Sequence, residues 1–157
     1  MRKIIFVLII LTLSCSRDIL TNNQYTDGIK NYLESTFKIK SERFKSTGVF
    51  ILPLSSCTPC LQSTLKFIGT LKPNAVMVFA IGKSDASETS RLLQILKNQF
   101  ETYHDTIGDL KFYRTNIGTP YYFEMRNNGE FYGIDLNDQN IGLLKSQQGR
   151  QAYRFDQ

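Results

Sequence analysis

This sequence contains no tryptophan, one histidine and three cysteines among 157 residues, and these shortages limit the chemistry open to it. A structural zinc site needs four ligands, usually two Cys-x-x-Cys pairs or one pair supplemented by histidine. The chain offers a single such pair, Cys57 and Cys60, and only His104 besides. We therefore expect no metal site, and we expect His104 to be a solvated residue near a helix end.

Positive charge exceeds negative charge only modestly. The chain has 19 Lys and Arg against 14 Asp and Glu, a formal charge of +5. Arg2 and Lys3 lie in a segment that we expect to be removed, which leaves 17 basic residues and a charge of +3. No basic run with interleaved aromatic residues is present, so we expect no nucleic-acid partner. The composition, 41% hydrophobic and 21% charged, is typical of one globular domain.

The N-terminal apolar run, Ile4–Leu13, has about ten residues, well short of the roughly 20 that a membrane-spanning helix needs. With two basic residues before it and Ser14 and Cys15 after it, the run has the layout of a bacterial export signal. A cysteine at that position resembles a lipoprotein cleavage site. We predict removal of residues 1–14 and a lipid on Cys15. Because Leu11 is one residue further from the cysteine than usual, an ordinary signal peptide or a cytosolic chain stays an alternative.

Apolar periodicity predicts an order of helix, strand, helix, strand, helix, strand, β-hairpin and helix. The expected helices cover 25–37, a stretch that begins at Pro59, a stretch opened by Asp85 and Glu88 and carrying apolar residues to Tyr103, and 141–155. The expected strands cover 49–54, 75–82, 109–114 and the two arms of a hairpin in 119–135, joined at Asn127-Asn128-Gly129.

This order predicts an α/β fold with a mixed central sheet flanked by helices. Strands that alternate with helices imply crossover connections and parallel pairing, and the closing hairpin adds antiparallel strands. Pro53 interrupts the first apolar run, so that strand must end there or bulge. Cys57 then follows the carboxyl end of a central strand, where α/β folds place ligands and chemistry.

The Cys57 and Cys60 pair is expected at a helix N-terminus, because Pro59 favours the first helical turn. There, unsatisfied backbone N–H groups and the positive end of the helix dipole stabilise a thiolate. Cys57 would be the exposed nucleophile, and Cys60, one turn further on and more buried, would resolve a mixed disulfide. A purely structural bridge is the alternative, although so short a loop constrains little chain.

Two blocks resemble the thioredoxin superfamily: "GVFILPLSSCTPCLQSTLKFI", with the Cys-x-x-Cys pair, and "IGTPYYFEMRNNGEF", with Thr119-Pro120. The resemblance implies a thioredoxin-like fold over residues 45–157, preceded by a tether and an N-terminal helix in 15–44. It also implies that Pro120 is cis and lies against the cysteine pair, and that the backbone of Thr119 binds the substrate chain.

The longer spacing between the two blocks, through "SDASETSRLLQILKNQF", resembles the helical insert of membrane-anchored reductases of the TlpA/ResA type. This likeness implies a thiol–disulfide oxidoreductase on the periplasmic side of the bacterial cell envelope, anchored in the membrane by lipid. Its redox group would be the Cys57–Cys60 disulfide, with no further cofactor. Its partners would be disulfide-bearing envelope proteins and an upstream membrane reductant.

The sequence departs from that family at three positions. Ser56 stands where a tryptophan is usual, Pro53 interrupts the strand, and Ile51 replaces a buried carboxylate that takes part in proton transfer. Glu124 and Asp135 are the acidic residues that we consider as replacements for that carboxylate.

Three other functions remain open. The first is a non-catalytic thioredoxin-like lipoprotein that binds a peptide or protein. The others are a peroxide-reducing relative and a Cu(I) chaperone that uses both thiolates.

Overall fold

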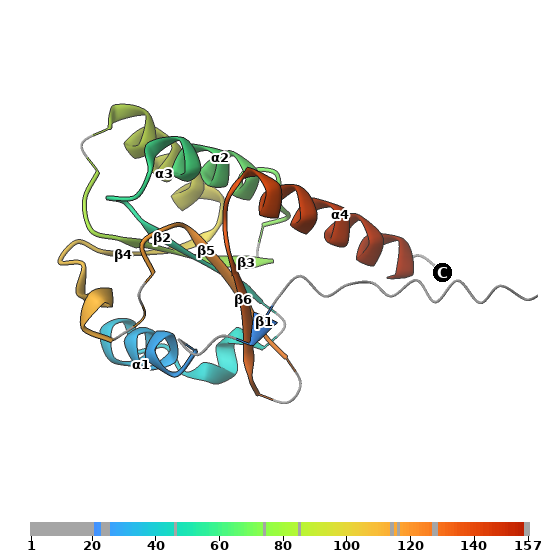
Figure 1. Cartoon of the computed structure of the whole chain (residues 1–157), viewed down its shortest axis with the longest axis horizontal. Coiled ribbons are helices and arrows are strands. Elements are labelled where there is room, and N and C mark those ends of the chain that lie inside the picture. The colour runs from blue at the N-terminus through green and yellow to red at the C-terminus, as the bar shows by residue number, and fades with distance from the viewer. Residues whose placement is uncertain are drawn as a thin grey trace, which may run out of the picture.

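A mixed six-stranded β-sheet forms the centre of the computed structural model (Figure 1). The structure describes residues 21–22, 26–45, 47–73, 75–84, 86–113, 115, 117–126 and 129–155. The predicted export signal and Cys15 lie outside these ranges, as do Asp85 and the Asn127-Asn128 pair.

The sheet has the strand order β1-β6-β5-β2-β3-β4. Strands β2, β3 and β4 are parallel, whereas β5 is antiparallel to both β2 and β6, and β1 is antiparallel to β6. The mixed sheet predicted from the sequence is therefore confirmed. Its strands are β1 (Thr21–Asn22), β2 (Gly48–Pro53), β3 (Val76–Ile81), β4 (Glu101–Asp105), β5 (Tyr121–Met125) and β6 (Phe131–Asp135).

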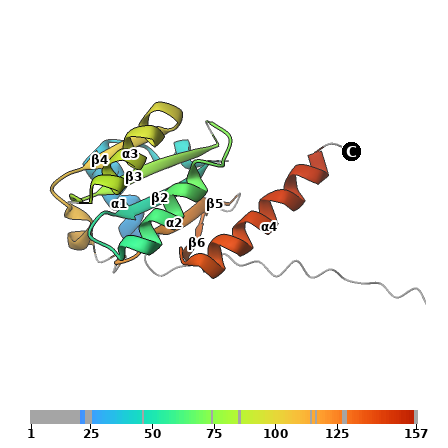
Figure 2. The same ribbon diagram turned by 90° about the horizontal axis from the view of Figure 1, so that it is seen from above.

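Helices cover both faces of the sheet. Figures 1 and 2 show α2, α3 and α4 on one face and α1 on the other. The side chains of β2 alternate accordingly: Phe50 and Leu52 belong to the core under α2, α3 and α4, and Val49 and Ile51 to the core beside α1. Burial on both faces explains why this strand is apolar throughout. The helices are α1 (Thr26–Phe37), α2 (Thr58–Ile68), α3 (Ser87–Gln99) and α4 (Asp138–Phe155), with 3₁₀ turns η1 (Ser41–Phe44) and η2 (Asp109–Tyr113).

The region after α3 differs from the prediction. Phe100 ends that helix, and Tyr103 lies in the edge strand β4. Within the segment expected as a strand at 109–114, residues 109–113 form the 3₁₀ turn η2, because the carboxylate of Asp105 accepts hydrogen bonds from the backbone N–H groups of Ile107, Gly108 and Asp109 at 2.9, 3.1 and 2.9 Å. These bonds hold the chain in a tight turn and prevent an extended strand.

The start of α3 also differs from the prediction. Ala86, and not Asp85, occupies the N-cap position, and it makes no side-chain capping bond. Glu88 accepts a hydrogen bond of 2.9 Å from Gln62 of α2, so its carboxylate joins two helices and does not close a capping box. The segment expected as a helical insert is the crossover helix α3 between the parallel strands β3 and β4.

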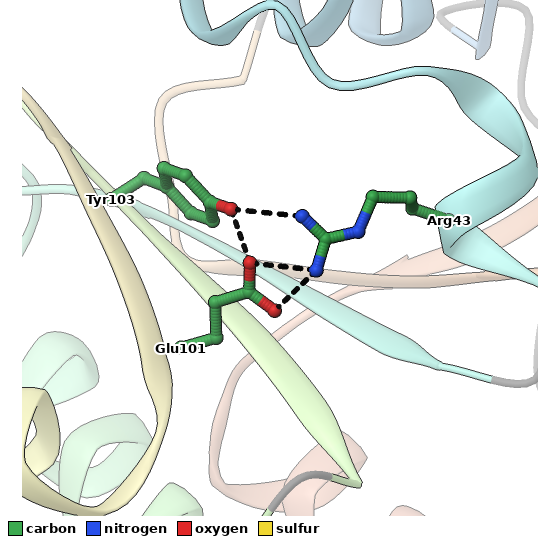
Figure 3. Close-up of polar contacts among 3 residues, drawn as sticks. All are labelled: Arg43, Glu101 and Tyr103. Carbon is green, nitrogen blue, oxygen red and sulfur yellow. Dashed lines mark hydrogen bonds and ion pairs between the residues drawn. The ribbon is translucent and has the colours of Figure 1, made fainter.

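A polar cluster ties η1 to β4 at the amino edge of the sheet (Figure 3). The Arg43 guanidinium lies 3.0 Å from the Glu101 carboxylate and 3.4 Å from the Tyr103 hydroxyl, which itself donates a hydrogen bond to Glu101. The Arg43 and Glu101 side chains are 53% and 37% exposed, and exposed ion pairs stabilise by about 0–1 kcal/mol. This cluster lies at the opposite edge from Cys57.

Candidate active site

Cys57 and Cys60 occupy the junction between β2 and α2. The strand ends at Pro53, after which the Leu54 N–H still donates a hydrogen bond of 2.8 Å to the Ile81 carbonyl of β3, and a turn leads to Cys57 at the N-cap of α2. The Cys57 sulfur accepts a hydrogen bond of 3.4 Å from the backbone N–H of Cys60. Pro59 lies in the first helical turn, as predicted, because a residue there needs no N–H donor.

The two thiols differ in exposure and in acidity. Both are free; Cys57 is exposed and Cys60 is partly buried, which is the order that the sequence predicted. Hydrogen bonds from the thiol and the backbone N–H of Cys60 lower the pKa of Cys57. The same interaction with Cys57, together with burial, raises the pKa of Cys60. Cys57 is therefore the thiol that loses its proton first.

Thr119 and Pro120 lie at the same edge of the sheet as Cys57. They directly precede Tyr121, the first residue of β5, which pairs with Ile51 of β2. The Thr119 hydroxyl donates a hydrogen bond of 3.0 Å to the Asp135 carboxylate at the end of β6. Pro120 is buried, and its carbonyl accepts a hydrogen bond of 2.7 Å from Leu136.

The expectation of a cis bond before Pro120 is wrong for this structure, since the described residues contain no cis peptide bond. The trans form of an X–Pro bond is lower in energy by about 0.5–1 kcal/mol, so cis requires specific contacts that favour it. Within the described part of the chain, the backbone N–H and C=O of Thr119 have no hydrogen-bond partner.

The acidic residues considered as proton acceptors lie at different edges. Glu124 pairs with Gly48 at the start of β2, and its carboxylate accepts a hydrogen bond of 3.3 Å from Tyr122, so it is remote from the thiols. Asp135 lies at the thiol edge and binds Thr119. Ile51 is buried in the core on the α1 side.

The Ser56 side chain, directly before Cys57, has a buried hydroxyl oxygen. This oxygen has no hydrogen-bond partner among the described residues. A tryptophan at this position would have been a large apolar surface beside the nucleophile; serine leaves a small polar one.

Asp138 is a site residue that the sequence analysis did not identify. It is the first residue of α4, and its negative charge raises the pKa of both Cys57 and Cys60. Two helices that follow parallel strands of one sheet begin at the same edge of that sheet. Helix α4 follows β6, which runs parallel to β2, so it begins at the edge where α2 begins. The sequence alone does not give the direction of β6 relative to β2.

The described residues contain no group of three or more His, Cys, Asp or Glu side chains suited to hold a metal ion. In the same part of the chain, no helix has the length and apolar character needed to span a bilayer. No protein-family model matches the chain, and a comparison with characterised proteins found no significant match.

Proposed function

We propose that this chain is a thiol–disulfide oxidoreductase of thioredoxin-like fold that reduces disulfides in partner proteins. The observation that carries the proposal is the asymmetry of the pair. Cys57 is an exposed thiol with a lowered pKa, and Cys60, one helical turn on, is partly buried with a raised pKa. Disulfide exchange requires one thiol that attacks as a thiolate and a second thiol that later resolves the mixed disulfide.

The thioredoxin-like fold is supported by topology. Strands β6, β5, β2 and β3 are adjacent in that order, and the cysteine pair lies between a central strand and the helix that follows it. An extended substrate chain could pair with the backbone of Thr119, which has no partner in the described structure. The trans bond at Pro120 is the feature that fits this family least.

The proposed reaction transfers two electrons from the Cys57 and Cys60 dithiol to a partner disulfide. The Cys57 thiolate attacks one partner sulfur, a Cys57–partner disulfide forms, and the other partner sulfur leaves as a thiolate. Cys60 loses its proton to solvent and attacks the Cys57 sulfur, which releases the second partner thiolate and forms the Cys57–Cys60 disulfide. The two released thiolates take up the two protons that the pair has lost.

A reductant at the membrane must then restore the dithiol by supplying two electrons and two protons. The export-signal pattern and Cys15 support placement on the periplasmic side of the bacterial cell envelope, with the chain anchored in the membrane by lipid. Replacement of Cys15 by Ser should move the chain from the membrane fraction to the soluble fraction. A Cys15→Ser chain that stays with the membrane would refute the lipid anchor.

The paired variants Cys57→Ser and Cys60→Ser test the reaction. Cys57→Ser should abolish reduction of a disulfide-bonded model protein, because the exposed thiol is lost and the remaining thiol, Cys60, is partly buried with a raised pKa. Cys60→Ser should still attack once and accumulate a mixed disulfide that non-reducing electrophoresis detects. Each variant is the other's control for folding, since both replace one sulfur in the same turn.

Retention of the reductase rate by Cys57→Ser would contradict the proposal. If neither variant nor the wild-type chain exchanges disulfides, a non-catalytic role in binding a peptide or protein becomes the better interpretation. Uptake of one equivalent of Cu(I) by the reduced chain alone would favour a metal chaperone.

A further inference from the structure

The N-termini of α2 and α4 lie at the same edge and on the same face of the sheet (Figures 1 and 2). Strand β6 is antiparallel to β5, and β5 is antiparallel to β2, so β6 and β2 run in the same direction. The helix that follows each strand therefore begins at the carboxyl edge. The first residues of the two helices are Thr58 and Asp138.

Direct packing between α2 and α4 fixes this arrangement. Leu61 and Leu65 of α2 share a buried cluster with Ile141 and Leu144 of α4. The Lys145 ammonium lies 5.6 Å from the centre of the Phe67 ring. Because apolar and cation–π contacts join α2 to the first two turns of α4, the position of Asp138 relative to the thiols is set by the fold.

The carboxylate of Asp138 does not cap its own helix. Asn137 performs that role: its side-chain oxygen accepts a hydrogen bond of 2.8 Å from the Asn140 N–H, and its carbonyl accepts one of 2.9 Å from Ile141. Asp138 makes no ion pair or side-chain hydrogen bond within the described part of the chain. No cation among the described side chains therefore forms an ion pair with this carboxylate.

Two other acidic side chains near α2 and β6 accept hydrogen bonds from neighbouring residues. Asp135 of β6 accepts the hydrogen bond of Thr119, and Glu88 of α3 accepts that of Gln62. Among the described residues, the charge that acts on Cys57 is that of Asp138, and the charges that act on Cys60 are those of Cys57 and Asp138, so the Asp138 charge opposes ionisation of both thiols.

We propose that the charge of Asp138 makes the Cys57–Cys60 pair a stronger reductant than it would be without that charge. This inference rests on the proposed oxidoreductase function. Two electrons and one proton convert the disulfide into a Cys57 thiolate and a Cys60 thiol. A nearby carboxylate repels the thiolate but has no comparable effect on the neutral disulfide, so it favours release of the electrons. Asp138 is thus a positioning residue that acts through the thiols.

The test compares Asp138→Asn with the wild-type full chain in buffers of reduced and oxidised glutathione. Asparagine removes the charge and keeps nearly the same shape. The equilibrium constant for disulfide formation should fall about two- to fourfold, the effect of one charge acting through water at short range. The Cys57 thiolate, followed by its ultraviolet absorbance, should form at lower pH in Asp138→Asn.

Two further variants separate charge from structure. Asp138→Glu retains the charge and should keep the wild-type constant. Glu88→Gln removes one negative charge from the start of α3, also beside α2, and should leave both readouts unchanged. Thermal melting of each variant establishes that it is folded.

The inference would be overturned, and the proposed function would stand, if the wild-type pair is reversible and Asp138→Asn has the same equilibrium constant for disulfide formation as the wild type. A wild-type pair without a reversible couple would remove both. An equal fall in Glu88→Gln would overturn the inference as well, because the effect would then reflect net charge and not Asp138.

Discussion

At the scale of single residues, the two cysteines acquire different properties from one turn of helix. Cys57 is the N-cap, and its sulfur accepts a hydrogen bond from the backbone N–H of Cys60, whereas Cys60 lies inside the first turn. The sequence predicted this order because a proline between the cysteines places a helix start there. It did not predict the trans bond at Pro120 or the charge of Asp138, since both depend on how distant segments meet.

Asp105 accepts more hydrogen bonds than any other carboxylate whose bonds the described structure shows. It is 6% exposed and accepts a hydrogen bond of 2.8 Å from the Tyr32 hydroxyl in addition to its three backbone N–H donors. Burial opposes its ionisation, but these four hydrogen bonds outweigh burial and lower the pKa of Asp105. The ionised side chain therefore joins α1, β4 and η2.

The lowered pKa makes the free energy of unfolding depend on pH. A carboxyl group with a folded pKa below its unfolded value, about 3.9, stabilises the fold at neutral pH. That contribution is lost as the pH falls through the unfolded value toward the folded pKa. Asp105→Asn should lower the free energy of unfolding by about 2–4 kcal/mol at neutral pH and flatten its decline in acid. Urea denaturation at a series of pH values measures both effects.

Tyr32→Phe is the matched variant for Asp105. It keeps the buried ring and removes one of the four hydrogen bonds, so a loss of about 1–2 kcal/mol is expected, with part of the acid dependence retained. An Asp105→Asn chain with the stability and acid dependence of the wild type would contradict this role.

At the scale of helices and strands, Gly28 permits the close approach of α1 to η2. A Cβ atom added at Gly28 would lie 2.3 Å from the Tyr113 carbonyl oxygen and 3.3 Å from a methyl carbon of Thr115. Alanine favours a helix by about 1 kcal/mol over glycine, whereas overpacking costs about 1–3 kcal/mol. The nearest atom belongs to the backbone, which cannot easily move aside, so the cost of overpacking should exceed the gain in helix propensity. Gly28→Ala should therefore lower the free energy of unfolding measured in urea.

Gly142 in α4 provides the control for Gly28. A Cβ atom there would meet nothing within 4 Å, so Gly142→Ala should raise the free energy of unfolding by up to about 1 kcal/mol. If both alanine variants stabilise the chain equally, α1 and η2 do not pack as closely as described.

A helix or strand was predicted correctly where its own segment carries a clear pattern of apolar residues. The apolar runs of β2 and β3, the paired arms β5 and β6, and all four helices have patterns that a single segment carries. Strand β4 does not: its sequence, "ETYHD", is polar, it lies at the edge of the sheet, and Phe100 and Tyr103 continue the helical spacing of α3. The fold of η2 depends on Asp105, which Tyr32 contacts from 73 residues away.

At the scale of the whole molecule, the sheet gathers separate segments at one edge. The junction of β2 and α2 carries the thiols, the start of β5 carries Thr119 and Pro120, and the junction of β6 and α4 carries Asp138. Sequence analysis identified the first two segments from their motifs. The third became apparent only when the direction of β6 was known.

The reduction potential of the Cys57–Cys60 pair is the measurement that tests the proposed function most directly. The full chain would be equilibrated in graded thiol–disulfide buffers, and its free thiols trapped by alkylation. A reversible two-electron couple between roughly −120 and −270 mV, the range of exchange catalysts, is the expected result. A disulfide that stays closed below about −300 mV would be a structural bridge and would contradict the proposed function.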